Sequence, residues 1–110
     1  MKIEQRRIGA AGIRFSVKDG NGEEIGRTFL YLLRNDLHRK PFGLMEDVYV
    51  KPGLRGDGIG TRLTESVIQK ARKLRCYKLI ATSRFSRRKV HELYQRLGYK
   101  KHGLEFRIDF

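Results

Sequence analysis

The stretch that decides the fold is Lys51-Pro52-Gly53-Leu54-Arg55-Gly56-Asp57-Gly58-Ile59-Gly60-Thr61. An apolar run over residues 44–50, typical of a β-strand, precedes it, and a pattern with helical spacing follows. The apolar positions of that pattern are Ile59, Leu63, Val67, Ile68, Ala71 and Leu74. The sequence therefore predicts a strand, a glycine-rich turn and a helix N-terminus in direct succession. Such a turn presents backbone N–H groups beside the positive end of a helix dipole, so we expect it to bind a phosphate or pyrophosphate.

The spacing of the glycines excludes two better-known phosphate-binding motifs. A P-loop requires Lys-Ser or Lys-Thr after its last glycine, whereas Ile59 and Gly60 follow Gly58 here. The Rossmann fingerprint G-x-G-x-x-G is absent as well, because these glycines are spaced G-x-G-x-G. What remains is the pattern R-x-x-G-x-G, which begins at Arg55. A merely flexible turn is the alternative interpretation.

Length and composition predict one globular domain over residues 1–110, with a hydrophobic content of 39%. The apolar runs near the N-terminus are too short for a signal peptide or a membrane span, so we expect no membrane association. Cys76 is the only cysteine, which rules out an internal disulfide and favours the cytoplasm. With three scattered histidines besides, we expect no metal site.

The formal net charge of +13 is concentrated in one part of the sequence. Nine basic and no acidic residues lie between Lys70 and Lys89. Three interpretations stay open: binding of nucleic acid by counterion release, a solvated positive face, or attraction of an anionic ligand. Only Tyr77 and Phe85 are aromatic within this run, which is weak support for a surface on which bases stack.

The remaining patterns predict a mixed α/β arrangement. Tight turns are expected at residues 9–12 and 19–22, and Gly98 is expected to end a helix in the left-handed conformation. Helices are expected over residues 59–74 and 89–97. Strands are expected over residues 2–8, 13–17, 25–33, 44–50, 78–81 and 104–110.

The second half of the chain resembles the GNAT superfamily of acetyl-CoA-dependent N-acetyltransferases. Three segments carry the resemblance, in the family's order and spacing: MEDVYV at residues 45–50, RGDGIGT at residues 55–61 and LYQRLGY at residues 93–99. The resemblance implies a GNAT-like α/β fold, in which two main helices flank a mixed, mostly antiparallel sheet. It also implies that the chain is an enzyme, with acetyl-CoA as cosubstrate and an amine as acceptor.

The resemblance further implies a set of cofactor-binding residues. The pantetheine arm is expected to lie between two strands that splay apart, paired with the backbone of Val48, Tyr49 and Val50. The pyrophosphate is expected on the turn, with Arg55 assisting. The turn residues are Gly56, Asp57, Gly58, Ile59, Gly60 and Thr61. Arg87 stands where the family often has an asparagine that contacts the cofactor.

Two catalytic roles follow from the same resemblance. Glu46 occupies the strand position of a general base that usually acts through water, and Asp47 is its substitute. A base matters because freeing the lone pair of a lysine-type amine costs about 4.6 kcal/mol at pH 7, against about 1 kcal/mol for an α-amino group. Tyr94 matches the tyrosine that protonates the departing thiolate. The alternatives are an ordinary strand carboxylate and a core tyrosine.

The N-terminal half departs from the family pattern. The family usually inserts two helices after its first strand, whereas only residues 9–12 separate the first two expected strands here. We therefore expect an open acceptor site, or one that a second subunit of a homodimer completes. An open site favours a protein or peptide amine.

The predicted function is transfer of an acetyl group from acetyl-CoA to a primary amine by direct attack. Cys76 lies away from the cofactor turn, so no acetyl-cysteine intermediate is expected. The alternatives are a noncatalytic module that binds CoA and a basic protein that binds nucleic acid.

Overall fold

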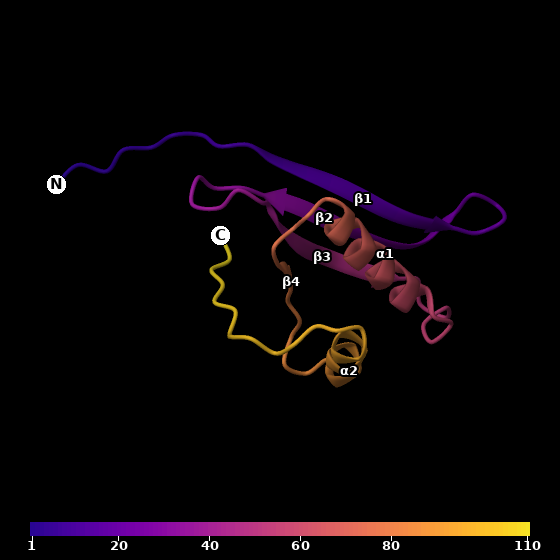
Figure 1. Cartoon of the computed structure of the whole chain (residues 1–110). Helices are drawn as coiled ribbons and strands as arrows, with labels where there is room; N and C mark the ends of the chain where they lie inside the picture. The colour runs from indigo at the N-terminus through magenta and orange to yellow at the C-terminus, as the bar shows by residue number, and fades with distance from the viewer.

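A four-stranded sheet forms the centre of the computed structural model, which describes all 110 residues (Figure 1). The strand order is β1-β2-β3-β4. The first three strands are antiparallel to their neighbours, while β4 runs parallel to β3. The predicted mixed, mostly antiparallel sheet with two helices is therefore confirmed. The elements are β1 (Ala10–Lys18), β2 (Glu24–Leu33), β3 (Phe42–Val50), α1 (Ile59–Lys73), β4 (Leu79–Ala81) and α2 (Arg88–Arg96).

The hairpin between β1 and β2 closes as its sequence predicts. The Asp19 carboxylate accepts hydrogen bonds from the backbone N–H groups of Asn21 (2.9 Å) and Glu23 (3.0 Å). Gly22 adopts a φ of 80°, a conformation that favours glycine. These local bonds set the register, which pairs Val17 with Gly26 and places the apolar side chains of β1 on one face.

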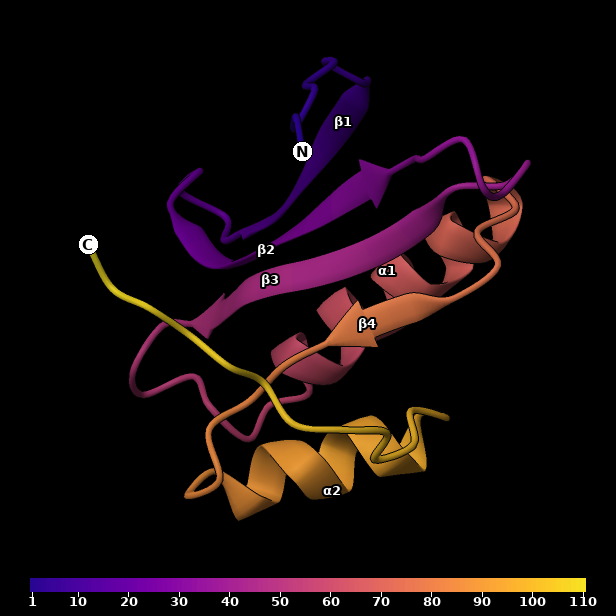
Figure 2. The ribbon, with the colours of Figure 1, turned by 90° about the vertical axis from the view of Figure 1, so that its left-hand side faces the viewer.

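One face of the sheet packs against α1, which lies behind the strands in Figure 2. The core of this layer consists of Leu30 from β2, Met45 from β3 and Val67 from α1, all three essentially buried. Tyr94 of α2 closes the same cluster. The four residues come from four different elements, so burial of this cluster is what holds the helices to the sheet.

The opposite face of β1, β2 and β3 carries aromatic and charged side chains. Phe29 and Tyr31 stack with their ring centroids 6.2 Å apart, and the Arg14 guanidinium lies 5.6 Å from the Phe29 centroid. Arg27 covers Tyr49 at 4.4 Å. Glu46 is the cross-strand partner of Phe29, so it belongs to this face as well.

The N-terminal expectations were wrong in two respects. Residues 2–8 form no strand, and the predicted turn at residues 9–12 is mostly part of β1, which begins at Ala10. The reason is pairing: β2 ends at Leu33, whose partner is Ala10, so residues 2–8 have no neighbouring strand. Gly12 lies opposite Tyr31, where a Cβ would come within 3.3 Å of the ring. Gly12, which in the sequence indicated a turn, therefore allows β1 to lie close to the Tyr31 ring of β2.

The strand expected over residues 104–110 was also wrong. The apolar and polar residues alternate as in a strand, but all seven residues are exposed and none is assigned to a sheet. β4 is only three residues long, and no strand pairs with its outer edge. The segment instead runs in front of the link between β4 and α2 (Figure 2).

Removal of a buried leucine from the shared cluster should be costly. We expect Leu30→Ala to lower the free energy of unfolding by about 2–5 kcal/mol, because it leaves a cavity between sheet and helices. Leu37→Ala is the matched control, since Leu37 is 83% exposed, and should change stability by about 0.5 kcal/mol or less. Urea unfolding measures both. Equal losses for the two variants would contradict this assignment of the core.

Candidate functional site

The glycine turn between β3 and α1 is shaped by backbone conformations that favour glycine. Gly53, Gly56 and Gly58 have φ values of 89°, 97° and 83°, and Gly58 is the residue that caps α1. The first hydrogen bond of the helix is from the Arg62 N–H to the Gly58 carbonyl, at 3.0 Å. The N–H groups of the first turn therefore have no acceptor within the helix, and no acidic side chain lies among them. This arrangement suits an anion.

Arg55 connects the turn to the end of β3. Its Nε atom donates a hydrogen bond to the Val50 carbonyl at 3.2 Å. Its terminal nitrogens make no hydrogen bond to the protein, and the side chain is exposed. The guanidinium is therefore held beside the turn with donors free for an anionic group.

The edge of β3 on the β4 side is open along much of its length. The two strands pair only from Gly43 to Met45, so β3 has no neighbour there from Glu46 to Val50. At the point of divergence Asp47 adopts a φ of 53°, and the register against β2 shifts. The fully buried Thr28 hydroxyl donates a hydrogen bond to the Glu46 carbonyl at 3.0 Å. This β-bulge leaves Val48 to Val50 with an unpaired backbone edge that leads to the glycine turn.

Glu46 lies half-buried at the divergence of β3 and β4. Partial burial raises the pKa of its carboxyl above the usual value, and the negative charges of Asp47 and Glu105 raise it further. The positive charge of Arg107 and the nearby Thr82 hydroxyl act in the opposite direction. A raised pKa brings the carboxyl closer to neutrality and makes it a better proton acceptor at physiological pH.

Tyr94 is buried on α2, with its ring centroid 5.2 Å from that of Tyr99. Burial raises the pKa of its hydroxyl, and the negative charge of Glu46 adds to the effect. The positive charge of Arg87, the residue that caps α2, lowers it. Tyr94 therefore keeps its proton at neutral pH, and it lies within electrostatic reach of both Glu46 and Arg87.

The structure gathers most of the sequence-predicted residues at one end of the sheet. The open β3 edge leads to the turn, which opens α1, and Arg87 follows β4 at that same end (Figure 2). Sequence reasoning missed Thr28, Thr82 and the two charges of the C-terminal segment, Glu105 and Arg107. No local pattern identifies them, because each acts on Glu46 across a long stretch of chain.

The basic run from Lys70 to Lys89 does not form one surface. Its first part ends α1 and leads into β4, next to the start of β3. Its second part lies beyond β4, around the N-terminus of α2. Because β3 and β4 are parallel, the two parts lie at opposite ends of the sheet, and only the second is near the glycine turn.

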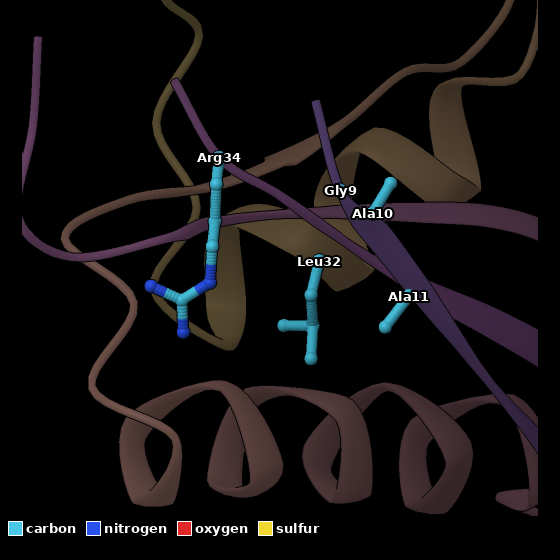
Figure 3. Close-up of a pocket in the computed structure, with 5 residues that line it drawn as sticks. All are labelled: Gly9, Ala10, Ala11, Leu32 and Arg34. Carbon is cyan, nitrogen blue, oxygen red and sulfur yellow. The ribbon is translucent and has the colours of Figure 1, made fainter. Parts of the chain in front are cut away.

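A shallow pocket of about 270 Å³ lies away from this site. Its lining consists of Gly9, Ala10, Ala11, Leu32 and Arg34, of which only Arg34 is charged (Figure 3). Ala10 of β1 pairs with Leu33 of β2, and Leu33 pairs on its other side with Phe42, the first residue of β3. The glycine turn follows the last residue of β3. The pocket therefore lies at the other end of the sheet from the glycine turn.

Comparison with known proteins identifies the family. The sequence model of the acetyltransferase (GNAT) family matches residues 2–99. The chain belongs to this family. The resemblance predicted from the sequence is thus confirmed.

Two curated relatives and one solved structure illustrate the likeness. A glucosamine 6-phosphate N-acetyltransferase of Trypanosoma brucei brucei is 36% identical over 67 residues, which cover 61% of this chain and 44% of that protein. An aminoalkylphosphonate N-acetyltransferase of Salmonella typhimurium is 29% identical over 86 residues, which cover 78% of this chain and 56% of that protein. The chain thus spans about half the length of these relatives. A Trypanosoma brucei acetyltransferase structure superposes with a TM-score of 0.83 at 27% identity, covering 90% of this chain and 69% of that one.

Two further features of this GNAT chain bear on its site. None of its helices is long and apolar enough to cross a membrane. No three His, Cys, Asp or Glu side chains are grouped so that they could hold a metal ion.

The charge neighbours of Glu46 can be tested by titration. We expect Asp47→Asn to lower the pKa of Glu46, because it removes a negative charge that disfavours the ionised carboxyl. Asparagine tolerates the positive φ of this position, so the bulge should persist. Carboxyl carbon NMR measures the midpoint. Glu65 is exposed on α1, so Glu65→Gln should leave the pKa of Glu46 unchanged. An unchanged midpoint in Asp47→Asn would contradict the effect assigned to the Asp47 charge.

Proposed function

We propose that this GNAT domain transfers the acetyl group of acetyl-CoA to a primary amine by direct attack. The observation that carries the proposal is the open β3 edge, which runs from Glu46 to Val50 and leads straight to a turn with unpaired N–H groups. An extended arm that ends in a pyrophosphate fits that sequence of features. The family match supports the same cosubstrate.

In this proposal the pantetheine arm pairs with the backbone of Val48, Tyr49 and Val50 as an additional strand. The pyrophosphate accepts hydrogen bonds from turn N–H groups between Gly56 and Thr61, including those of Asp57 and Ile59. Arg55 supplies a charged donor from a position fixed by the Val50 carbonyl. The arm then leads the thioester toward the divergence of β3 and β4, where Glu46 lies.

The reaction needs one proton removed and one supplied. Glu46, through a water molecule, accepts the proton of the amine, whose nitrogen attacks the thioester carbonyl carbon. The carbon–sulfur bond breaks, and the thiolate leaves with a proton from Tyr94. The raised pKa of Glu46 favours the first transfer. Burial and the charge of Glu46 raise the pKa of Tyr94, and the charge of Arg87 opposes that rise and so favours the second transfer, a role for the residue that replaces the family's asparagine.

The acceptor is proposed only as a class. Both curated relatives are named for acceptors that combine an amine with a phosphate or phosphonate group. The net charge of +13 attracts such anions over a distance. Glu46 is only half-buried, which also leaves the site accessible to the amine of a peptide. A second subunit that closes this face remains a prediction, as does a cytoplasmic location.

Turnover of acetyl-CoA tests the proposal. Release of free thiol should depend on an added amine: glucosamine 6-phosphate, aminoethylphosphonate or a lysine peptide. Tyr94→Phe should lower kcat by about 100-fold, the usual contribution of a positioned acid. Glu46→Gln should lower kcat/KM most for acceptors of high pKa, because these need a base to free the lone pair.

Tyr77→Phe is the matched control, since Tyr77 is exposed and lies at the other end of the sheet. It should leave turnover unchanged. Binding of acetyl-CoA without amine-dependent thiol release would favour the noncatalytic module. Full activity in both Tyr94→Phe and Glu46→Gln would remove these residues from the mechanism.

A further inference from the structure

Two segments distant in the sequence meet at the end of the sheet opposite the glycine turn. The loop over residues 34–41 follows β2, and residues 74–78 connect α1 to β4. The Tyr77 N–H donates to the Pro41 carbonyl at 3.0 Å, and the Gly43 N–H donates to the Lys78 carbonyl at 2.9 Å. Figure 2 shows the loop after β2, the end of α1 and the start of β4 together at the upper right.

This contact builds an exposed aromatic stack that neither segment contains alone. The rings of His38 and Tyr77 lie 4.4 Å apart with 26° between their planes, and Phe42 meets Tyr77 edge-on at 6.1 Å. His38 is exposed and Tyr77 is 40% exposed. The Lys78 ammonium lies 4.8 Å from the Phe42 centroid and 5.4 Å from that of Tyr77.

The segments that build the stack and the end of α1 are rich in cations. Besides Arg34, which lines the pocket described above, six exposed cations come from the same two segments and the last turn of α1: Arg39, Lys40, Arg72, Lys73, Arg75 and Lys78. The only acidic residue of these segments is Asp36, whose carboxylate pairs with Arg6 at 3.1 Å. None of the six cations has an acidic partner within salt-bridge distance. We call these six cations together with His38, Phe42 and Tyr77 the aromatic–basic surface.

We propose that the aromatic–basic surface binds single-stranded nucleic acid. The six cations neutralise successive phosphates, and an unpaired base stacks on the exposed His38–Tyr77 pair. In a duplex the bases are stacked on one another and offer no free face to the rings. An acidic polypeptide would use the cations but not the aromatic stack. The combination of the two therefore favours a single strand.

This surface is separate from the proposed acetyl-transfer site. β3 begins at the aromatic–basic surface and ends at the glycine turn, and its nine residues span roughly 26 Å. None of the nine residues of the surface belongs to the cofactor or catalytic sets. Nucleic-acid binding and acetyl transfer can consequently be lost independently.

Fluorescence anisotropy with labelled oligo(dT) and oligo(rU) tests the proposal, with a duplex of equal length as comparison. We expect micromolar binding to the single strands at 50 mM salt and a slope of log K against log salt between about −2 and −4. The charge reversal Arg72→Glu/Arg75→Glu/Lys78→Glu should weaken binding more than tenfold. The ring substitution His38→Ser/Tyr77→Leu should weaken it about tenfold, because a stacked base is lost.

Matched variants control for net charge and for loss of an exposed ring. Lys18→Glu/Lys100→Glu/Lys101→Glu reverses three exposed charges elsewhere, and Phe85→Leu removes an aromatic ring that is 85% exposed. Both should bind as the unmodified chain does, and circular dichroism should show every variant folded. A preference between oligo(dT) and oligo(rU) assigns the natural strand as DNA or RNA. Absence of binding, equal binding of the duplex, or a ring variant of unchanged affinity would each overturn the proposal.

Discussion

The short pairing between β3 and β4 is the constraint on which the rest of the site depends. Three residues of β3 pair with β4, after which the bulge at Asp47 turns the strand away. Asp47 holds a φ of 53°, which is unfavourable for a residue other than glycine. The hydrogen bond from the buried Thr28 hydroxyl to the Glu46 carbonyl helps to hold the chain in this conformation. Local backbone strain is thus balanced by a bond that the core supplies.

The other features of the site follow from this divergence. Because β3 leaves β4, its edge is open toward the glycine turn, and the turn is held to the strand by Arg55. The same divergence leaves Glu46 only half-buried beside Thr82, which follows β4. Tyr94, held on α2 by its packing in the core cluster, lies within electrostatic reach of Glu46. One irregularity in one strand therefore places backbone donors, a carboxylate and a phenol at one end of the sheet.

How far the sequence predicted the structure depended on the range of the interactions. The hairpin at Asp19 and the left-handed Gly98 were predictable because their bonds lie within a few residues. The two helices were predictable because their apolar residues recur with helical spacing. Residues 2–8 and 104–110 were mispredicted because alternation only permits a strand, whereas a neighbouring edge is needed to form one.

The same distinction applies to the functional surfaces. The anion-binding character of the glycine turn was visible in its spacing, and Glu46 and Tyr94 were found by resemblance to the GNAT family. The bond from Thr28, the charges of Glu105 and Arg107 on Glu46, and the stack of His38 on Tyr77 were not visible. Each of these joins segments at least 18 residues apart, and topology alone brings such segments together.

The central claim is that the open β3 edge and the glycine turn receive one extended ligand, and amide NMR tests it most directly. Titration with acetyl-CoA should shift the backbone N–H resonances of Val48 and Val50 together with those of Gly58, Gly60 and Thr61. The two groups should saturate at the same concentration, because a single molecule contacts both. Shifts confined to the turn would mean that the turn binds an anion while nothing pairs with the β3 edge, which contradicts the claim of one extended ligand. Shifts in neither group would contradict the account.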